Sequence, residues 1–115
     1  MAIAVNATKE SLAVAYTNLG AWISLHTADP GTTGTSEATG GSPAYARKQT
    51  TWTAGSSDGV VTGSQVTFDV PAATYAYVGL WSASTGGTFI DKVAITSTTM
   101  SAQGQILVTP TFTQS

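Results

Sequence analysis

One stretch, QVTFDVPAATYAYVGLWS at Gln65–Ser82, decides the fold. Its first half alternates, because the apolar residues Val66, Phe68 and Val70 are separated by polar ones. A period of two predicts a strand that buries one face. Pro71 ends this strand, and the TYAYVGLWS that follows is apolar on both faces, as expected of a central strand covered on two sides. Together the two patterns predict a layered β-protein.

Further strand patterns lie on both sides of this stretch. They are short and fall at Ala21–Thr27, Arg47–Thr53, Val60–Val70, Thr88–Ile95 and Gln105–Thr109. Ser57–Gly59 predicts a turn, Gly86-Gly87 predicts a hairpin, and Pro110 and Phe112 are assigned to a tail. About six or seven short strands at this spacing predict an antiparallel β-sandwich, either jelly-roll-like or immunoglobulin-like.

A single short helix is expected near the N-terminus, over residues 7–19. Asn6 or Thr8 should cap its start, and Gly20 stands where a left-handed C-terminal cap is wanted. An apolar stripe with helical spacing should bury one side of it. The residues of this stripe are Leu12, Ala15, Tyr16 and Leu19. A helix this short needs a surface on which to dock.

The composition limits the classes of protein that fit. The 115 residues predict a single domain spanning 1–115. Four basic and six acidic residues give a net charge of −2, so the surface lacks the basic field that attracts nucleic acid and opposes self-association only weakly. The chain has no cysteine, and no apolar run approaches the ~20 residues that span a bilayer. We therefore expect no nucleic-acid partner, no membrane partner and no thiolate metal site.

The stretch LHTADPGTTGTSEATGGSPAYAR, at Leu25–Arg47, collects the rare residue types. It holds the only histidine, the only arginine and two of the six acidic residues. Residues 28–43 exceed the ~12–15 residues usual for a connection without regular structure, so we expect a long ordered loop. Asp29-Pro30-Gly31 predicts a turn, because Asp caps its own backbone, Pro fixes φ and Gly accepts a positive φ.

His26, Asp29 and Glu37 are the candidates for a metal or acid–base site. Catalytic zinc usually needs three ligands rich in imidazole or thiolate, and calcium needs more oxygens than these two carboxylates supply. The alternative, which we favour, is that His26 hydrogen-bonds the loop backbone or Glu37. The one G-x-S-x-G match, at residues 55–59, overlaps the predicted turn at Ser57–Gly59 rather than joining a strand to a helix, and no glycine pattern fits a phosphate-binding loop. We expect no enzyme activity, no catalytic residue, no metal and no cofactor.

Glu37 and Arg47 carry opposite charges towards the two ends of the loop. An ion pair between them would clasp the loop, and the alternative is that each side chain is solvated separately. An exposed ion pair would contribute only about 0–1 kcal/mol to the free energy of unfolding. Its main effect would therefore be to fix the position of the loop.

Five aromatic residues lie in predicted strands and are candidates for a contact surface: Trp22, Trp52, Trp81, Tyr75 and Tyr77. One alternative is a stacking platform for a sugar or a base. The other is a place in the core or in a subunit interface, and it is favoured because strands supply all five residues.

The loop and its flanks resemble a family of small virion proteins of tailed bacteriophages, notably those that infect actinobacteria. The residues that carry the resemblance are Leu25-His26-Thr27, Asp29-Pro30-Gly31, Gly34, Glu37, Tyr45-Ala46-Arg47 and Trp52. The resemblance implies a structural particle component, such as a minor tail, tail fibre, head fibre or capsid decoration protein. It implies no enzyme activity and supplies no catalytic residue.

Resemblance and composition together set the functional expectation. We expect a capsid decoration or minor capsid protein that binds the head exterior as a homo-oligomer, with a trimer as the natural arrangement at a symmetry point. One alternative is a minor tail protein or a fibre or baseplate adaptor, and another is a carbohydrate-binding module for host recognition. The expected partners are the major capsid protein or tail proteins, and the expected location is the virion, assembled in the host cytoplasm.

Overall fold

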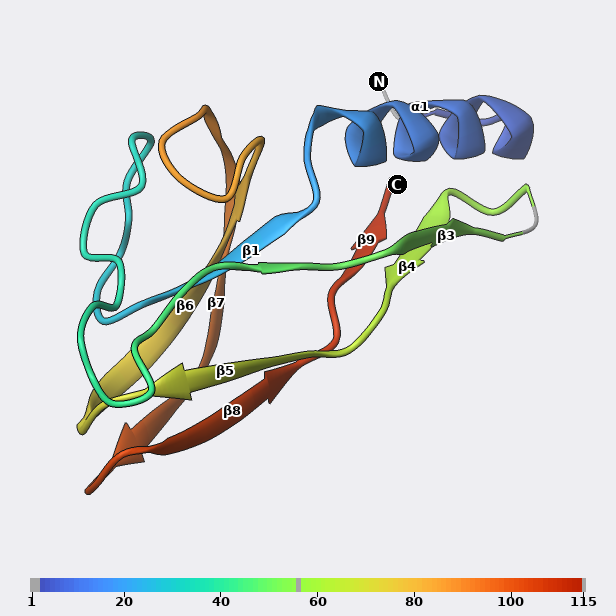
Figure 1. The fold of residues 1–115 in the computed structure, drawn as a ribbon. Helices are drawn as coiled ribbons and strands as arrows, with labels where there is room; N and C mark the ends of the chain where they lie inside the picture. Colours follow the sequence, from blue (N-terminus) through green and yellow to red (C-terminus); the bar gives the residue numbers. More distant parts are fainter. Residues whose placement is uncertain (1–2, 56, 115) are drawn as a thin grey trace.

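The computed structural model describes residues 3–55 and 57–114. These residues form one helix followed by strands (Figure 1). The elements are α1 (Asn6–Leu19), β1 (Trp22–His26), β2 (Lys48–Gln49), β3 (Trp52–Ala54), β4 (Val60–Gly63), β5 (Val66–Val70), β6 (Ala73–Trp81), β7 (Phe89–Met100), β8 (Gly104–Val108) and β9 (Thr111–Thr113). No helix in the described part of the chain has the length and apolar character needed to cross a membrane.

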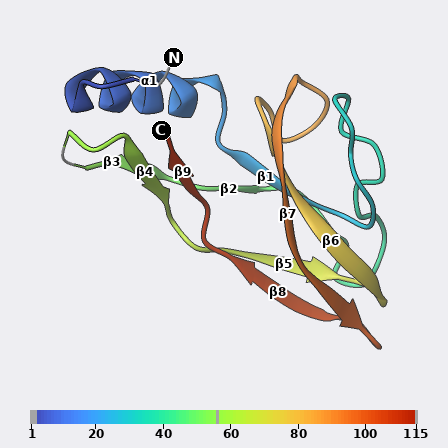
Figure 2. The same cartoon turned by 180° about the vertical axis from the view of Figure 1, so that it is seen from behind.

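The strands form three antiparallel sheets. The largest has the order β2-β1-β6-β7, and we call it the main sheet. The β5–β8 pair lies across from it, and the β3-β4-β9 sheet lies under α1 (Figures 1 and 2). The mainly β sandwich with one N-terminal helix that the sequence predicts is confirmed.

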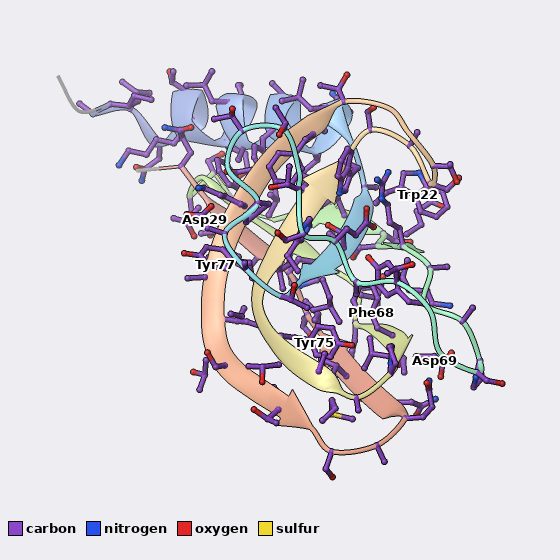
Figure 3. The ribbon with its side chains drawn as sticks, turned by 90° about the vertical axis from the view of Figure 1, so that its left-hand side faces the viewer. Trp22, Asp29, Phe68, Asp69, Tyr75 and Tyr77 are labelled. Carbon is purple, nitrogen blue, oxygen red and sulfur yellow. The ribbon has the colours of Figure 1, made fainter. Side chains whose placement is uncertain are left out.

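The core lies between the main sheet and the β5–β8 pair. Val66, Phe68 and Val70 of β5 are all buried, as their alternation predicts. They meet a cluster of side chains from the main sheet: Ile23, Leu25, Tyr75, Val78 and Leu80. Figure 3 shows Phe68 and Tyr75 in this interior, while Asp29 lies at the periphery.

The helix differs from its prediction in its caps and in its buried face. It starts after Val5, no side chain caps its start, and Asn6 and Thr8 both lie inside it. Gly20 is extended, with a φ of 175°, so it is not a left-handed cap. Its small size matters instead because a Cβ there would collide with the Trp81 carbonyl.

The predicted apolar stripe is also wrong, because Leu12, Ala15 and Leu19 are exposed. The helix turns Ala13 towards β3 and β4 and buries it completely. The half-buried Tyr16 stacks on Phe112 of β9, with the ring centroids 3.7 Å apart. A third sheet that the sequence did not predict therefore decides which face of the helix is covered.

Four strand patterns differ from the sequence predictions. Val60–Val70, which was expected as one strand, is divided into β4 and β5, and these belong to different sheets. Arg47–Thr53 is divided into β2 and β3. Thr50 lies between them, is buried, and donates from its hydroxyl to the Ser64 carbonyl. β7 continues five residues past Ile95, to Met100. The assigned tail is in fact β9, which pairs with β4, and the Pro110 carbonyl accepts from the Gly63 N–H at 2.7 Å.

Candidate functional site

The 28–43 loop begins with a tight turn at Asp29–Gly31. The Gly31 N–H donates to Asp29 Oδ1 at 2.8 Å, and Gly31 has a φ of +63°. Pro30 is buried, and its carbonyl accepts from the N–H groups of Gly34 and Thr35 at 3.0 and 3.1 Å. The turn that the sequence predicts is present, and it fixes the direction in which the rest of the loop leaves β1.

The middle of the loop runs alongside β1 as an added antiparallel segment. Glu37 forms an isolated β-bridge with His26. On either side of it, the Thr27 N–H donates to the Ser36 carbonyl at 3.0 Å and the Ala38 N–H donates to the Leu25 carbonyl at 2.9 Å. These bonds pair the backbone of a segment that has no regular secondary structure of its own.

Arg47 is the centre of the site. Its Nε and Nη2 donate to the two different oxygens of Glu37, each at 2.9 Å, and the two side chains are only 8% and 22% exposed. Its Nη1 donates to the carbonyls of Ala83 and Gly86, in the β6–β7 hairpin, at 3.0 and 2.9 Å. The guanidinium also lies 3.6 Å from the ring centre of Trp81. A planar guanidinium suits this combination of a two-point pair and a stacking contact.

Tyr45 extends the arrangement into the core. Its hydroxyl donates to Glu37 Oε2 at 2.8 Å and accepts from the Leu25 N–H at 3.1 Å. Burial raises the pKa of Tyr45 well above its usual range, so the hydroxyl stays protonated and keeps donating. The ring stacks against Phe68, with the centroids 6.0 Å apart. We call Glu37, Tyr45, Arg47 and Trp81 the brace.

Gly34 is the point at which the loop touches Trp81. Its φ is +80°, and a Cβ there would collide with the indole ring. Gly40 has a similar φ of +86° but no atom within 4 Å of a Cβ. Gly34 is thus needed for both backbone conformation and space, whereas Gly40 is needed for conformation alone.

The brace joins two loops that are distant in sequence. The 28–43 loop and the β6–β7 hairpin loop stand side by side at the same end of the main sheet (Figure 1). Between them lies a shallow hollow of about 270 Å³, which is lined by Glu37, Tyr45, Arg47, Ser84 and Gly86. The structure therefore brings together the two ends of the Leu25–Arg47 stretch. It also places against them the β6–β7 hairpin, a contact that the sequence did not predict.

His26 is fully buried under the loop, where it is part of a chain of hydrogen bonds. Its Nδ1 is 2.8 Å from the Thr35 carbonyl, which can only accept, so Nδ1 carries the proton. Its Nε2 therefore accepts from Ser24 Oγ at 2.7 Å, and Ser24 Oγ accepts from Trp81 Nε1 at 2.9 Å. Burial lowers the pKa of His26, which keeps the imidazole neutral.

Sequence reasoning missed Ser24 as the partner of His26, although strand alternation places the two residues on one face. A serine beside a histidine is the start of a nucleophilic dyad. Here both side chains are buried, and a backbone carbonyl takes the place of the acidic third member. The pair holds the loop and Trp81 against β1.

The three candidate metal ligands do not form one cluster. Glu37 is bound to Arg47, His26 is bound to Ser24 and Thr35, and Asp29 bonds Lys92 of β7. The hydrogen bond from Lys92 and that from the Gly31 N–H lower the pKa of Asp29. Within residues 3–55 and 57–114, no group of three or more His, Cys, Asp or Glu side chains is placed to hold a metal ion.

The five candidate aromatic residues are spread over several environments. Trp81 and Tyr75 are buried, while Trp22, Trp52 and Tyr77 are half-buried. Trp52 Nε1 donates to the Gly20 carbonyl at 2.9 Å, and the Tyr75 hydroxyl donates to the Pro71 carbonyl at 2.8 Å. The closest ring stacking involves Tyr16 and Phe112, which were not among the candidates.

The comparison with protein families identifies the chain. No curated protein matches it. A family model described as Podophage GP4 fiber I protein gp80 matches residues 5–113, which include the helix, the brace and strands of all three sheets. The chain therefore belongs to the podophage GP4 fiber I protein gp80 family.

Proposed function

We propose that this protein is a non-enzymatic structural component of a phage virion and that its place is in a fibre. The observation that carries the proposal is the family match over residues 5–113, whose description names a podophage fibre protein. The resemblance to virion proteins of tailed phages points to the same kind of particle.

The chemistry of the site supports a structural role. His26 and Glu37, which the sequence offered as acid–base candidates, and Arg47 all have their polar atoms engaged in holding the loop. Ser24, the one hydroxyl beside the histidine, is buried beneath Trp81. These hydrogen bonds hold the 28–43 loop in one conformation.

The two braced loops serve as the contact surface for other virion proteins. Their tips carry small, uncharged and exposed residues such as Thr32, Thr39 and Thr85. A surface of this kind gains specificity from its shape, because it has few charges with which to steer a partner. A rigid loop also loses little conformational entropy on binding.

Immuno-electron microscopy of intact virions tests the location. Gold-labelled antibody against this chain should lie on fibres and should be absent from virions assembled without the protein. Gold confined to the head surface would overturn the fibre proposal and favour the capsid decoration that the sequence suggested first.

A pair of matched substitutions tests the contact surface. Thr39→Arg adds bulk to the exposed loop, while Thr67→Arg adds it to the exposed side of β5. Both proteins should fold, and only Thr39→Arg should lower incorporation into virions. Equal incorporation of the two variants would contradict the assignment of the contact surface to the loops.

A further inference from the structure

The described chain is divided into two lobes. The helical lobe consists of α1, β3, β4 and β9, which lie together at one end of the molecule (Figures 1 and 2). The sandwich consists of the main sheet and the β5–β8 pair. Among the described residues, no helix or strand of the helical lobe packs extensively against a strand of the sandwich. The extensive packing between elements therefore lies within each lobe.

The helical lobe has a small core of its own. Ala13 of α1 and Val61 of β4 are both completely buried, yet neither belongs to the cluster of buried side chains inside the sandwich. The Tyr16 ring stacks on Phe112 within the same lobe. Of the described side chains in this lobe, Tyr16 and Trp52 are the two that reach the core cluster of the sandwich. The lobe can therefore keep its internal packing when its orientation changes.

The described chain passes between the lobes four times, and each crossing is short. Two residues outside regular structure separate α1 from β1, β2 from β3, β4 from β5, and β8 from β9. In chain order, the crossings are Gly20-Ala21, Thr50-Thr51, Ser64-Gln65 and Thr109-Pro110. Residues at the ends of helices and strands are the ones that absorb the backbone rotation of a hinge.

Backbone hydrogen bonds join neighbouring crossings into one row. Each bond runs from an N–H group to a carbonyl: from Thr50 to Ala21 at 2.8 Å, from Ser64 to Thr51 at 3.0 Å, and from Gly63 to Pro110 at 2.7 Å. A row of short connections that are bonded to one another permits rotation about the row and resists sliding along it. The crossings therefore have the geometry of a single hinge.

A groove separates the lobes on one side of this row. It has a volume of about 480 Å³, and most of the side chains that line it are apolar. Trp52 and Phe112 line it from the helical lobe, and Val93 and Ile95 line it from β7. Because these side chains leave the groove unfilled, close packing does not fix the angle between the lobes there.

A hydrogen bond spans the groove. The Tyr16 hydroxyl donates to Asp91 Oδ2, in β7, at 3.0 Å, and both residues line the groove. Burial, together with the charge of Asp91, raises the pKa of Tyr16 well above its usual value, so the hydroxyl stays protonated and able to donate. Asp91 is exposed, so water can take the place of the tyrosine when the bond opens.

We propose that the helical lobe is hinged on the sandwich at the four crossings, and that the hydrogen bond between Tyr16 and Asp91 is the latch that holds it closed. Opening the latch rotates α1 away from β7 and widens the groove, while Phe112 moves together with Tyr16. The two braced loops connect strands of the main sheet, so the hinge changes the angle between α1 and the proposed contact surface. This inference concerns the chain itself and does not depend on its location in the virion.

Distances between two spin labels test the hinge. The chain has no cysteine, so Ser11→Cys in α1 and Thr67→Cys in β5 introduce one exposed labelling site on each lobe. Labelled protein is diluted with unlabelled protein, so that the measured distances are those within one chain. The doubly labelled protein should give one narrow distance distribution. Adding Tyr16→Phe, which removes the hydroxyl and keeps the ring, should add a population at other distances.

Matched variants separate the latch from a general loss of stability. Tyr75→Phe is the control, because the Tyr75 hydroxyl donates to the Pro71 carbonyl in the sandwich, and it should leave the distribution narrow. Asp91→Ala removes the other partner of the latch, so it should reproduce the effect of Tyr16→Phe, and combining the two should add nothing further. An already broad distribution before substitution, an unchanged one in Tyr16→Phe, or equal broadening in Tyr75→Phe would overturn the proposal.

Discussion

The brace is attached to the main sheet through Trp81 of β6, and β7 is the outer strand of the same sheet. The two regions differ in how far their polar groups are hydrogen-bonded. At the brace, every nitrogen of the Arg47 guanidinium donates, and the Glu37 carboxylate accepts from both Arg47 and Tyr45. At β7 a whole strand edge is left without a partner strand in the described chain. Satisfied groups hold one shape, whereas unsatisfied backbone groups and bare apolar side chains favour association.

Removing Arg47 should have the largest effect on stability. Arg47→Ala leaves the half-buried Glu37 without its cation and should lower the free energy of unfolding by about 3–5 kcal/mol. Urea denaturation measures the change. Arg47→Lys keeps the charge but loses the two-point geometry, so it should recover only part of the loss. A full recovery would mean that charge alone matters at the brace.

The fit of Gly34 against Trp81 should come next. Gly34→Ala combines a strained positive φ with a collision and should destabilise the fold by about 2–4 kcal/mol. Gly40→Ala shares the positive φ without the collision and should cost about 1 kcal/mol. The two variants can be compared by urea denaturation, and equal losses would show that Trp81 does not restrict the loop.

The buried His26 should make stability depend on pH. Its pKa in the fold lies below the ordinary value of 6.5, so the unfolded chain binds a proton first as the pH falls. The contribution of the neutral imidazole is complete above pH 6.5 and is lost as the pH falls through the folded pKa. Denaturation curves recorded at several pH values should show this loss, and His26→Gln should lack it. An identical pH dependence of the two proteins between pH 7 and 5.5 would contradict a neutral buried histidine.

The exposed pair between Lys92 and Asp29 should matter least. Both side chains are well exposed, so water and salt screen the attraction. Lys92→Ala should leave the denaturation midpoint nearly unchanged at physiological salt. A loss as large as that of Arg47→Ala would break the contrast between the brace and the surface near β7.

Local patterns were enough to predict most of the strands. The alternation of Val66, Phe68 and Val70 determined which face of β5 is buried, because a strand in a sandwich has only two faces. The turn at Asp29–Gly31 could also be predicted from the sequence, because proline and glycine determine the backbone conformation locally.

The remaining features depend on partners that are remote in sequence. The buried face of α1 follows from Phe112, almost a hundred residues from Tyr16, so helical spacing alone led to the wrong stripe. The burial of Ser24 depends on Trp81, which is 57 residues away and donates to its hydroxyl, so nothing in the sequence next to Ser24 indicates it. The opposite charges of Glu37 and Arg47 suggested a pair, but the hairpin carbonyls that complete the brace could not be inferred from either residue.

The contacts of Arg47 set an order of events during folding. Glu37 is 10 residues away from it, whereas the hairpin carbonyls of Ala83 and Gly86 are 36 and 39 residues away. Contacts of long sequence separation form after the loops between them have closed. The full set of Arg47 contacts can therefore form only after the chain as far as Gly86 has been synthesised, and we expect the 28–43 loop to be more sensitive to proteases until then.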